Sequence, residues 1–141
     1  MKKFLFLLLI LACASCSEDT SIDPTLMPEA TSEGRNTFGC LLDGWVYTSG
    51  RFGLPQATSY TDESGYKVVI TAPVDLFSTF ILTLENPVAH STCPYTGSGN
   101  LGDGEAFITR NDGKVISGTF QGEDVTQGRF DIRFTEEDEE G

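Results

Sequence analysis

The chain has 141 residues with 21 acidic and nine basic side chains, and its formal net charge at pH 7 is −12. It contains no basic stripe that would neutralise a phosphate backbone, so the composition argues against nucleic-acid binding. The length suits one domain with one hydrophobic core rather than two.

The first sixteen residues have the pattern of a bacterial lipoprotein signal. Two lysines precede an apolar run over residues 4–12, which is too short for a permanent membrane span, and small residues come directly before Cys16. We therefore predict that residues 1–15 are a signal peptide and that Cys16 is lipidated, so that the protein meets the membrane through a lipid anchor. Cys13 is the alternative anchor, and a cleaved secretion signal without lipid is the alternative interpretation.

The residues after the anchor bear on location. Ser17, Glu18 and Asp19 follow Cys16 directly. This order resembles the export signal of surface lipoproteins in Bacteroidota-type bacteria, and the resemblance implies an outer-membrane lipoprotein that is displayed at the cell surface. The alternative is that these residues only begin a solvated tether. Cleavage leaves seven basic and 21 acidic side chains, so the mature net charge is −14, which favours solubility and disfavours anionic headgroups.

Two acidic segments flank the predicted domain. Residues 16–36 carry five acidic side chains and two prolines without apolar periodicity, so we expect a lipidated, flexible tether. Residues 136–141 include five consecutive acidic residues and are expected to form a frayed acidic tail. The folded domain is therefore expected to span residues 37–135.

Apolar residues in this domain recur with a period of two, which is typical of half-buried strands. The segments with this alternation are residues 66–72, 79–85, 115–121 and 129–135, and residues 105–110 show it more weakly. Asp43-Gly44 and Asp112-Gly113 predict tight hairpin turns, because both pairs accept positive backbone angles. We predict an all-β domain, a single antiparallel β-sandwich or barrel of about seven to eight strands.

Cys40 and Cys93 remain after removal of the signal, in a compartment that permits oxidation. A disulfide between them would close a long loop and stabilise the fold by roughly 4 kcal/mol. We therefore expect a Cys40–Cys93 disulfide, and two buried free thiols are the alternative.

Metal and cofactor sites are not expected. The glycine-rich residues 97–104 lack the lysine and the helix start of a phosphate-binding loop, and Asn100, Asp103 and Glu105 do not match the spacing of a calcium loop. One histidine and two cysteines supply too few ligands for a tetrahedral zinc site.

The sequence also offers no catalytic constellation. His90 is the only histidine and stands in an irregular stretch close to Cys93, with no second base nearby in the sequence. The acidic residues stand mostly beside glycine or in polar turns, so their spacing selects no pair for hydrolysis. We therefore expect a protein that is not an enzyme.

Aromatic residues in turns and loops are the candidate binding groups, since flat aromatic faces stack on sugars or peptides. These residues are Trp45, Tyr47, Phe52, Tyr60 and Tyr95. The leading hypothesis is a lipid-anchored envelope domain that binds a glycan, peptide or protein, or associates structurally. The alternative is a lipocalin-like carrier with an apolar cavity lined by residues such as Phe80, Phe107 and Phe120, and a minor hydrolase is a third hypothesis.

Two patches carry a family resemblance. They are residues 37–46, with the sequence TFGCLLDGWV, and the pair formed by residues 116–120 and 128–132, with the sequences ISGTF and GRFDI. Both patches resemble a group of uncharacterised small lipoproteins from Bacteroidota. The shared residues belong to turns and to the core, so the resemblance implies an all-β domain and no particular activity.

Overall fold

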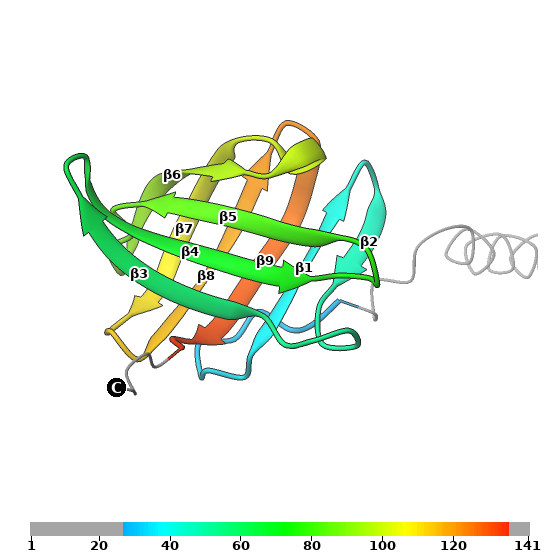
Figure 1. The fold of residues 1–141 in the computed structure, drawn as a ribbon, viewed down its shortest axis with the longest axis horizontal. Coiled ribbons are helices and arrows are strands. Elements are labelled where there is room, and N and C mark those ends of the chain that lie inside the picture. The colour runs from blue at the N-terminus through cyan, green and yellow to red at the C-terminus, as the bar shows by residue number, and fades with distance from the viewer. Residues whose placement is uncertain (1–26, 136–141) are drawn as a thin grey trace, which may run out of the picture.

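The computed structural model describes residues 27–135, which form a single nine-stranded antiparallel sheet (Figure 1). The strand order is β2-β1-β9-β8-β7-β6-β5-β4-β3. The strands are β1 (Thr37–Leu42), β2 (Trp45–Thr48), β3 (Gln56–Asp62), β4 (Gly65–Pro73), β5 (Thr79–Glu85), β6 (Ser91–Gly97), β7 (Gly104–Asn111), β8 (Val115–Gly122) and β9 (Val125–Arg133), and a short 3-10 turn, η2 (Gly99–Leu101), precedes β7.

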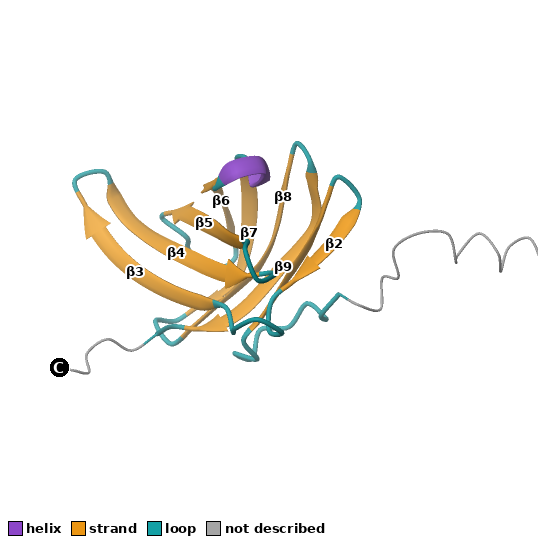
Figure 2. Ribbon diagram, turned by 45° about the vertical axis from the view of Figure 1, so that its right-hand side comes forward, coloured by secondary structure: helices purple, strands orange, loops and turns teal. Residues whose placement is uncertain are grey.

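The sheet curls into a half-barrel, as Figure 2 shows from the side. The prediction of an all-β fold is therefore confirmed. The predicted number of strands was too low, because the described residues contain nine strands rather than seven or eight. They also belong to one curled sheet and not to two packed sheets.

Both predicted hairpin turns are present. Asp43 and Gly44 have positive φ angles of 53° and 85° and join β1 to β2, and Gly113 has a φ angle of 85° between β7 and β8. Asp112 stabilises the second turn because its Oδ1 accepts the N–H groups of Lys114 (2.9 Å) and Val115 (3.0 Å). Local residue chemistry thus determines these two connections.

The core lies in the hollow of the curled sheet, on the inward faces of the strands. Alternation predicted these faces correctly: Val68, Ile70, Leu82 and Leu84 are all fully buried. A stack of aromatic rings fills the centre, with Phe120 at 5.5 Å from Phe38 and lying between Tyr95 and Phe130. Gly128 allows this packing, since a Cβ there would lie 2.6 Å from the Phe120 ring.

The open side of the half-barrel is bridged by contacts that we call the seam, in which each edge strand contacts another part of the sheet across the hollow. β2 and β3 are consecutive in the chain but occupy opposite edges, so the loop of residues 49–55 crosses from one edge to the other. At one end of the seam the N–H of Thr135 donates to the carbonyl of Ala57 at 2.8 Å. At the other end Tyr47 of β2 packs against Phe80 of β5, with ring centroids 5.3 Å apart. Side chains close much of this half-barrel.

An N-terminal strap, residues 28–36, crosses the outer face of β7, β8 and β9. Its main anchor is Asp131 of β9, a buried carboxylate. This carboxylate accepts hydrogen bonds from the hydroxyls of Thr31 and Ser117 and from the N–H groups of Glu33, Gly34 and Arg35. The prediction of a flexible tether up to Asn36 was therefore wrong for the strap, which is fixed to the sheet.

Arginines on the sheet hold the strap at three further points. Arg129, Arg110 and Arg133 donate to the carbonyls of Pro28 (3.0 Å), Ser32 (2.9 Å) and Gly34 (3.0 Å). These bonds satisfy backbone acceptors that would otherwise lie against the outer face of the sheet.

The predicted signal peptide, the anchor Cys16, residues 17–26 of the tether and the acidic tail lie outside the described residues. Within residues 27–135 no helix has the length and apolar character needed to cross a bilayer.

Candidate binding site

A recess opens at the end of the molecule where the β1–β2 hairpin approaches β5. Its volume is about 350 Å³. Its lining combines apolar rings with short polar side chains from three separate segments: Leu42 and Tyr47 from the first hairpin; Asp75, Phe77, Ser78, Thr79 and Phe80 from the β4–β5 loop and β5; and Ser98, Gly99 and Asn100 before β7.

The β4–β5 loop forms one wall of the recess. The carboxylate of Asp75 accepts the N–H of Phe77 at 2.8 Å, and the N–H of Val74 donates to the carbonyl of Ser78 at 3.0 Å. This tight turn directs the Phe77 ring away from the core, so that it is 95% exposed. Only one carboxylate oxygen of Asp75 is used by the turn, which leaves the other for a ligand.

The turn after β6 forms the opposite wall. Ser98 exchanges two hydrogen bonds with Ile81 of β5, since its N–H donates to the Ile81 carbonyl (3.0 Å) and its hydroxyl accepts the Ile81 N–H (3.1 Å). The N–H of Leu101 donates to the Ser98 carbonyl, and Leu101 is buried. Asn100 stands exposed between these two fixed residues. The wall is therefore anchored, and it presents an amide to the recess.

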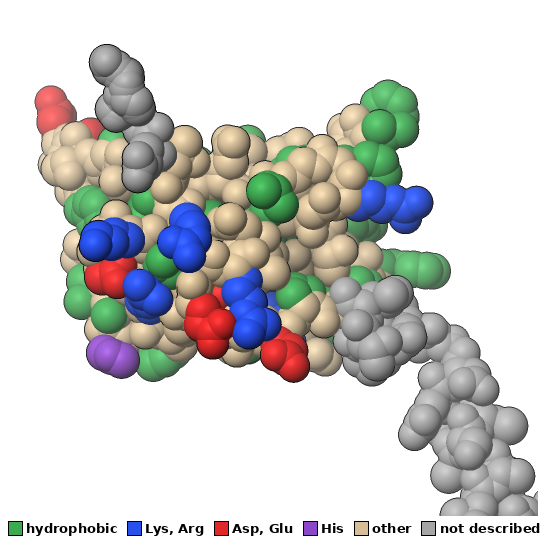
Figure 3. Space-filling view, turned by 90° about the horizontal axis from the view of Figure 1, so that it is seen from below, with side chains coloured by type: hydrophobic (Ala, Val, Ile, Leu, Met, Phe, Trp, Pro, Cys, Tyr) green, Lys and Arg blue, Asp and Glu red, His purple; other side chains and the backbone are tan. Residues whose placement is uncertain are grey.

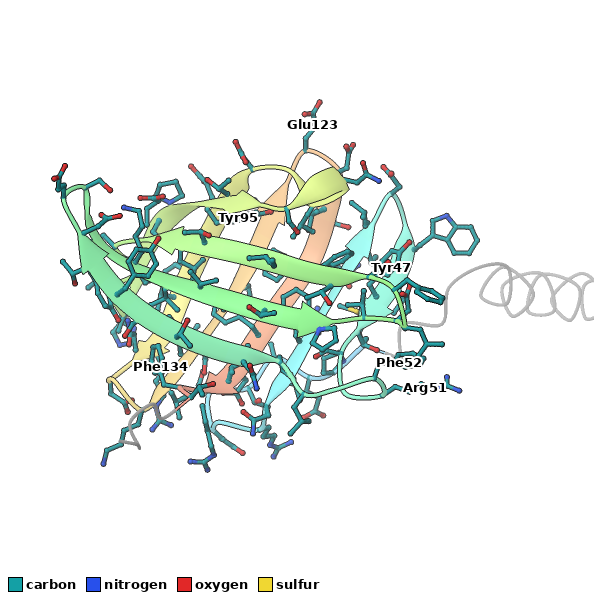
Figure 4. The ribbon with its side chains drawn as sticks, in the orientation of Figure 1. Tyr47, Arg51, Phe52, Tyr95, Glu123 and Phe134 are labelled. Carbon is teal, nitrogen blue, oxygen red and sulfur yellow. The ribbon has the colours of Figure 1, made fainter. Side chains whose placement is uncertain are left out.

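Large apolar side chains surround the recess at the same end of the molecule. We call them the apolar rim: Trp45, Phe52, Leu54, Leu76 and Phe77, all of which are exposed. Figure 3 shows hydrophobic side chains gathered at this end, and Figure 4 shows Tyr47, Arg51 and Phe52 together there. The Arg51 guanidinium lies 5.7 Å from the centre of the Phe52 ring. Such a concentration of exposed apolar surface on a small domain is typical of interaction sites, so the rim is a candidate one.

The structure brings together some of the predicted aromatic residues and separates others. Trp45, Tyr47 and Phe52 lie at the recess or its rim. Tyr60 is exposed on the edge strand β3, and Tyr95 is 2% exposed within the core. Burial raises the pKa of Tyr95 to about 12, and its hydroxyl has no hydrogen-bond partner among the described residues. Tyr95 is therefore a core residue.

The residues proposed for a carrier cavity do not share one space. Phe80 and Phe120 both pack on Phe38 in the core, with ring centroids 6.4 and 5.5 Å away. Phe107 is 44% exposed and lies on the outer face, beside a second, smaller depression over β6–β9. Aromatic side chains occupy the centre of the half-barrel, where an apolar ligand would have to bind.

The expected disulfide is not formed. Cys40 in β1 and Cys93 in β6 are both buried free thiols. Three strands, β9, β8 and β7, lie between β1 and β6 in the sheet. A disulfide needs Cα atoms within about 7 Å, which strands so far apart in one sheet do not readily provide. Burial raises the pKa of Cys40 to about 12 and also raises that of Cys93, so both sites favour the protonated thiol.

The remaining candidates are the possible metal ligands, His90 and the glycine-rich segment. Among residues 27–135 no group of three or more histidine, cysteine or acidic side chains is placed to hold a metal. His90 is exposed in the loop before β6, at a φ angle of 67°. The glycine-rich residues 97–104 form the end of β6, η2 and the start of β7, so they shape a wall of the recess.

Sequence reasoning missed most of the β4–β5 wall. The sequence assigns Leu76, Phe77 and Ser78 to no element or site, and Asp75 is only one of the acidic residues among which spacing selects no pair. A signal was present, because two large apolar residues within a short polar turn cannot both reach the core.

Comparison of the chain with models of known protein families, with curated proteins and with solved structures finds no match in any of the three. The resemblance to small Bacteroidota lipoproteins therefore stays a prediction.

Proposed function

We propose that this protein is a lipid-anchored domain of the cell envelope, held in the outer membrane through Cys16, which binds a carbohydrate chain in the recess without catalysing a reaction. The observation that carries the proposal is the convergence of aromatic rings and short polar groups from three separate segments on one recess. The lipoprotein pattern of residues 1–16 supports the envelope location.

The chemistry of the recess suits a sugar. Tyr47 and Phe77 offer flat faces for the C–H surface of a pyranose ring. Asp75, Thr79 and Asn100 supply carboxylate, hydroxyl and amide groups, which accept from and donate to sugar hydroxyls. A pocket with apolar walls and a few convergent polar groups is the usual form of a small-ligand site.

The negative charge of the recess and of the whole chain favours one class of carbohydrate ligand. Asp75 is the only charged residue that lines the recess, and the mature chain carries a net charge of −14. Acidic glycans would be repelled by both the local and the overall charge. The proposed ligand is therefore a neutral glycan.

The test uses the full chain with Cys13 and Cys16 replaced by serine, so that it carries no lipid. A glycan array followed by calorimetric titration is expected to give a neutral glycan as ligand. Phe77→Ala and Asn100→Ala should each weaken binding about tenfold, which corresponds to roughly 1.4 kcal/mol. Phe107→Ala, which removes an exposed ring on the outer face, is the matched control and should leave the affinity unchanged.

Two outcomes would refute this assignment. One is a glycan that binds equally well to the wild type, Phe77→Ala and Asn100→Ala. The other is an array with no neutral glycan bound, while a peptide library yields a ligand that those two variants lose.

A further inference from the structure

We propose that the apolar rim rests on the lipid surface of the membrane that anchors the chain. Trp45, Phe52, Leu54 and Leu76 would then contact the headgroup and upper acyl region, while the Phe77 ring stays at the recess that it lines. This inference rests on the lipid anchor of the proposed function, but it does not depend on which ligand the recess takes.

The rim residues come from three loops that meet at one end of the molecule. Trp45 is on the β1–β2 hairpin, and Leu76 and Phe77 are on the β4–β5 loop. The β2–β3 loop lies beside the end of β4, because a Cβ on Gly53 would be 3.0 Å from Pro73. Tyr47 and Phe77 both line the recess, which links the first two loops. The rim is thus one surface.

The N-terminal part of the described chain joins the sheet close to this end. Pro28 packs beside the paired residues Gly39 and Thr48 at the end of β2, and the β2–β3 loop begins directly after Thr48. Only ten residues lie between Cys16 and Met27 in sequence, so the lipid would lie at most about 40 Å from Met27 along an extended chain.

The charged side chains at the two ends of the molecule also favour an orientation with the rim towards the membrane. Arg51 is the cation at the rim, placed over Phe52, and a guanidinium beside an aromatic ring suits the zone of lipid phosphates. Asp62 and Glu63 lie in the β3–β4 hairpin, at the far end of the molecule in Figures 1 and 2. A membrane below the rim would face mainly apolar side chains and Arg51, with the carboxylates of Asp62 and Glu63 turned away.

Two carboxylates near the rim set the lipid preference. Asp43 is at the tip of the first hairpin, and Asp75 precedes Leu76. They disfavour a strongly anionic surface, so contact should be stronger on phosphatidylcholine vesicles than on phosphatidylglycerol vesicles.

Trp45 is the only tryptophan in the chain, so its fluorescence reports on the rim directly. The experiment uses the lipidated protein, with acylation verified by mass spectrometry, in phosphatidylcholine vesicles that contain brominated acyl chains. We expect bromine to quench Trp45 at least twofold and the emission to shift to the blue. Iodide quenching should be several-fold weaker than for the lipid-free chain, with Cys13 and Cys16 replaced by serine, in solution.

The Leu54→Ser/Leu76→Ser variant should lose bromine quenching and regain iodide quenching. Neither residue lines the recess, so glycan binding by the lipid-free variant should be unchanged. Val88→Ser/Phe107→Ser, with two exposed apolar residues outside the rim, is the matched control and should behave like the wild type.

A Trp45 that stays as accessible to iodide on vesicles as in solution would overturn the proposal. So would equal bromine quenching in the wild type and in Leu54→Ser/Leu76→Ser, or a mature chain without an acyl group. Glycan titration of the lipid-free chain is independent of all these outcomes, so failure of the proposed glycan binding would be recognised separately.

Discussion

Cys40 and Cys93 show how burial decides the chemistry of a side chain. Each lies on the inward face of its strand, and exclusion of water raises the pKa of both thiols. The thiolate is the reactive species, so both cysteines are protected twice, by poor access and by a high pKa. In this protein they act as small apolar residues.

We therefore expect the folded chain with Cys13 and Cys16 replaced by serine to show no thiol that reacts with Ellman's reagent at pH 8. In guanidinium chloride two thiols per chain should react. A reducing agent should leave the melting temperature unchanged, because there is no bridge to break. A drop of several degrees on reduction would instead establish the Cys40–Cys93 disulfide.

For single residues, the sequence predicted well which side chains face the core. Val68, Ile70, Leu82, Leu84, Phe130 and Ile132 follow the period of two and are buried. Alternation also places Ser117 and Asp131 correctly on the outer face. It predicts that they are exposed there, but both are buried. The reason is the strap, whose position depends on contacts about 100 residues away in sequence.

The strap is the element whose stability depends most on one residue. Burial raises the pKa of Asp131, but the hydrogen bonds from Ser117, Thr31, Gly34 and Glu33 outweigh this and lower it to about 2. The ionised carboxylate therefore stabilises the folded state at pH values above about 4. That contribution is lost as the pH falls from about 4 towards 2, where the folded group becomes protonated.

Asp131→Asn is expected to lower the free energy of unfolding by about 2 kcal/mol at pH 7, because an amide cannot accept all the bonds that the carboxylate accepts. Urea unfolding at pH 7 and at pH 2.5 measures the effect, and the gap between the variant and the wild type should shrink at the lower pH. Asp43→Asn is the control, since Asp43 is exposed and asparagine tolerates its positive φ angle. A gap that is equal at both pH values would contradict this account.

Two strands were missed for identifiable reasons. β3 is an edge strand in which only Ala57 is buried, so it has no apolar alternation to detect. β6 contains Pro94, which argues against a central strand. The proline is tolerated because β5 pairs with β6 only from Tyr95 to Gly97 and leaves the preceding part of β6 without that neighbour.

At the scale of the whole molecule, side-chain contacts at the seam hold the half-barrel closed. Phe80 contacts Phe38 and Tyr47 across the hollow of the sheet, at 6.4 and 5.3 Å between ring centroids. These contacts hold the β1–β2 hairpin towards β5 and so maintain the shape of the recess.

Phe80→Ala should therefore lower the free energy of unfolding by about 3 kcal/mol and abolish glycan binding even where the fold persists. Ile81→Ala, at the neighbouring outward position, is the control and should cost less than about 1 kcal/mol. Chemical denaturation and titration with the glycan measure the two effects. Retention of full affinity by Phe80→Ala would show that the recess does not depend on the seam.

The sequence could not distinguish one curled sheet from a sandwich, because that choice depends on which distant strands pair. β1 pairs with β9, and nothing in Phe38 or Phe130 alone specifies the partner. The recess was hidden for the same reason, since Tyr47, Asp75 and Asn100 meet only when the sheet curls.

The pairing of the first strand with the last has a consequence for biogenesis. If the chain is exported with its amino terminus leading, as the proposed envelope location implies, β1 and the strap cross the membrane long before β9, which carries the strap's partner Asp131. On that proposal, the edge of β1 that pairs with β9 stays unpaired until β9 has crossed, although β1 can already pair with β2. Periplasmic chaperones that recognise extended apolar segments should therefore hold residues 37–48 longest, and truncation before Val125 should leave a chain that proteases remove.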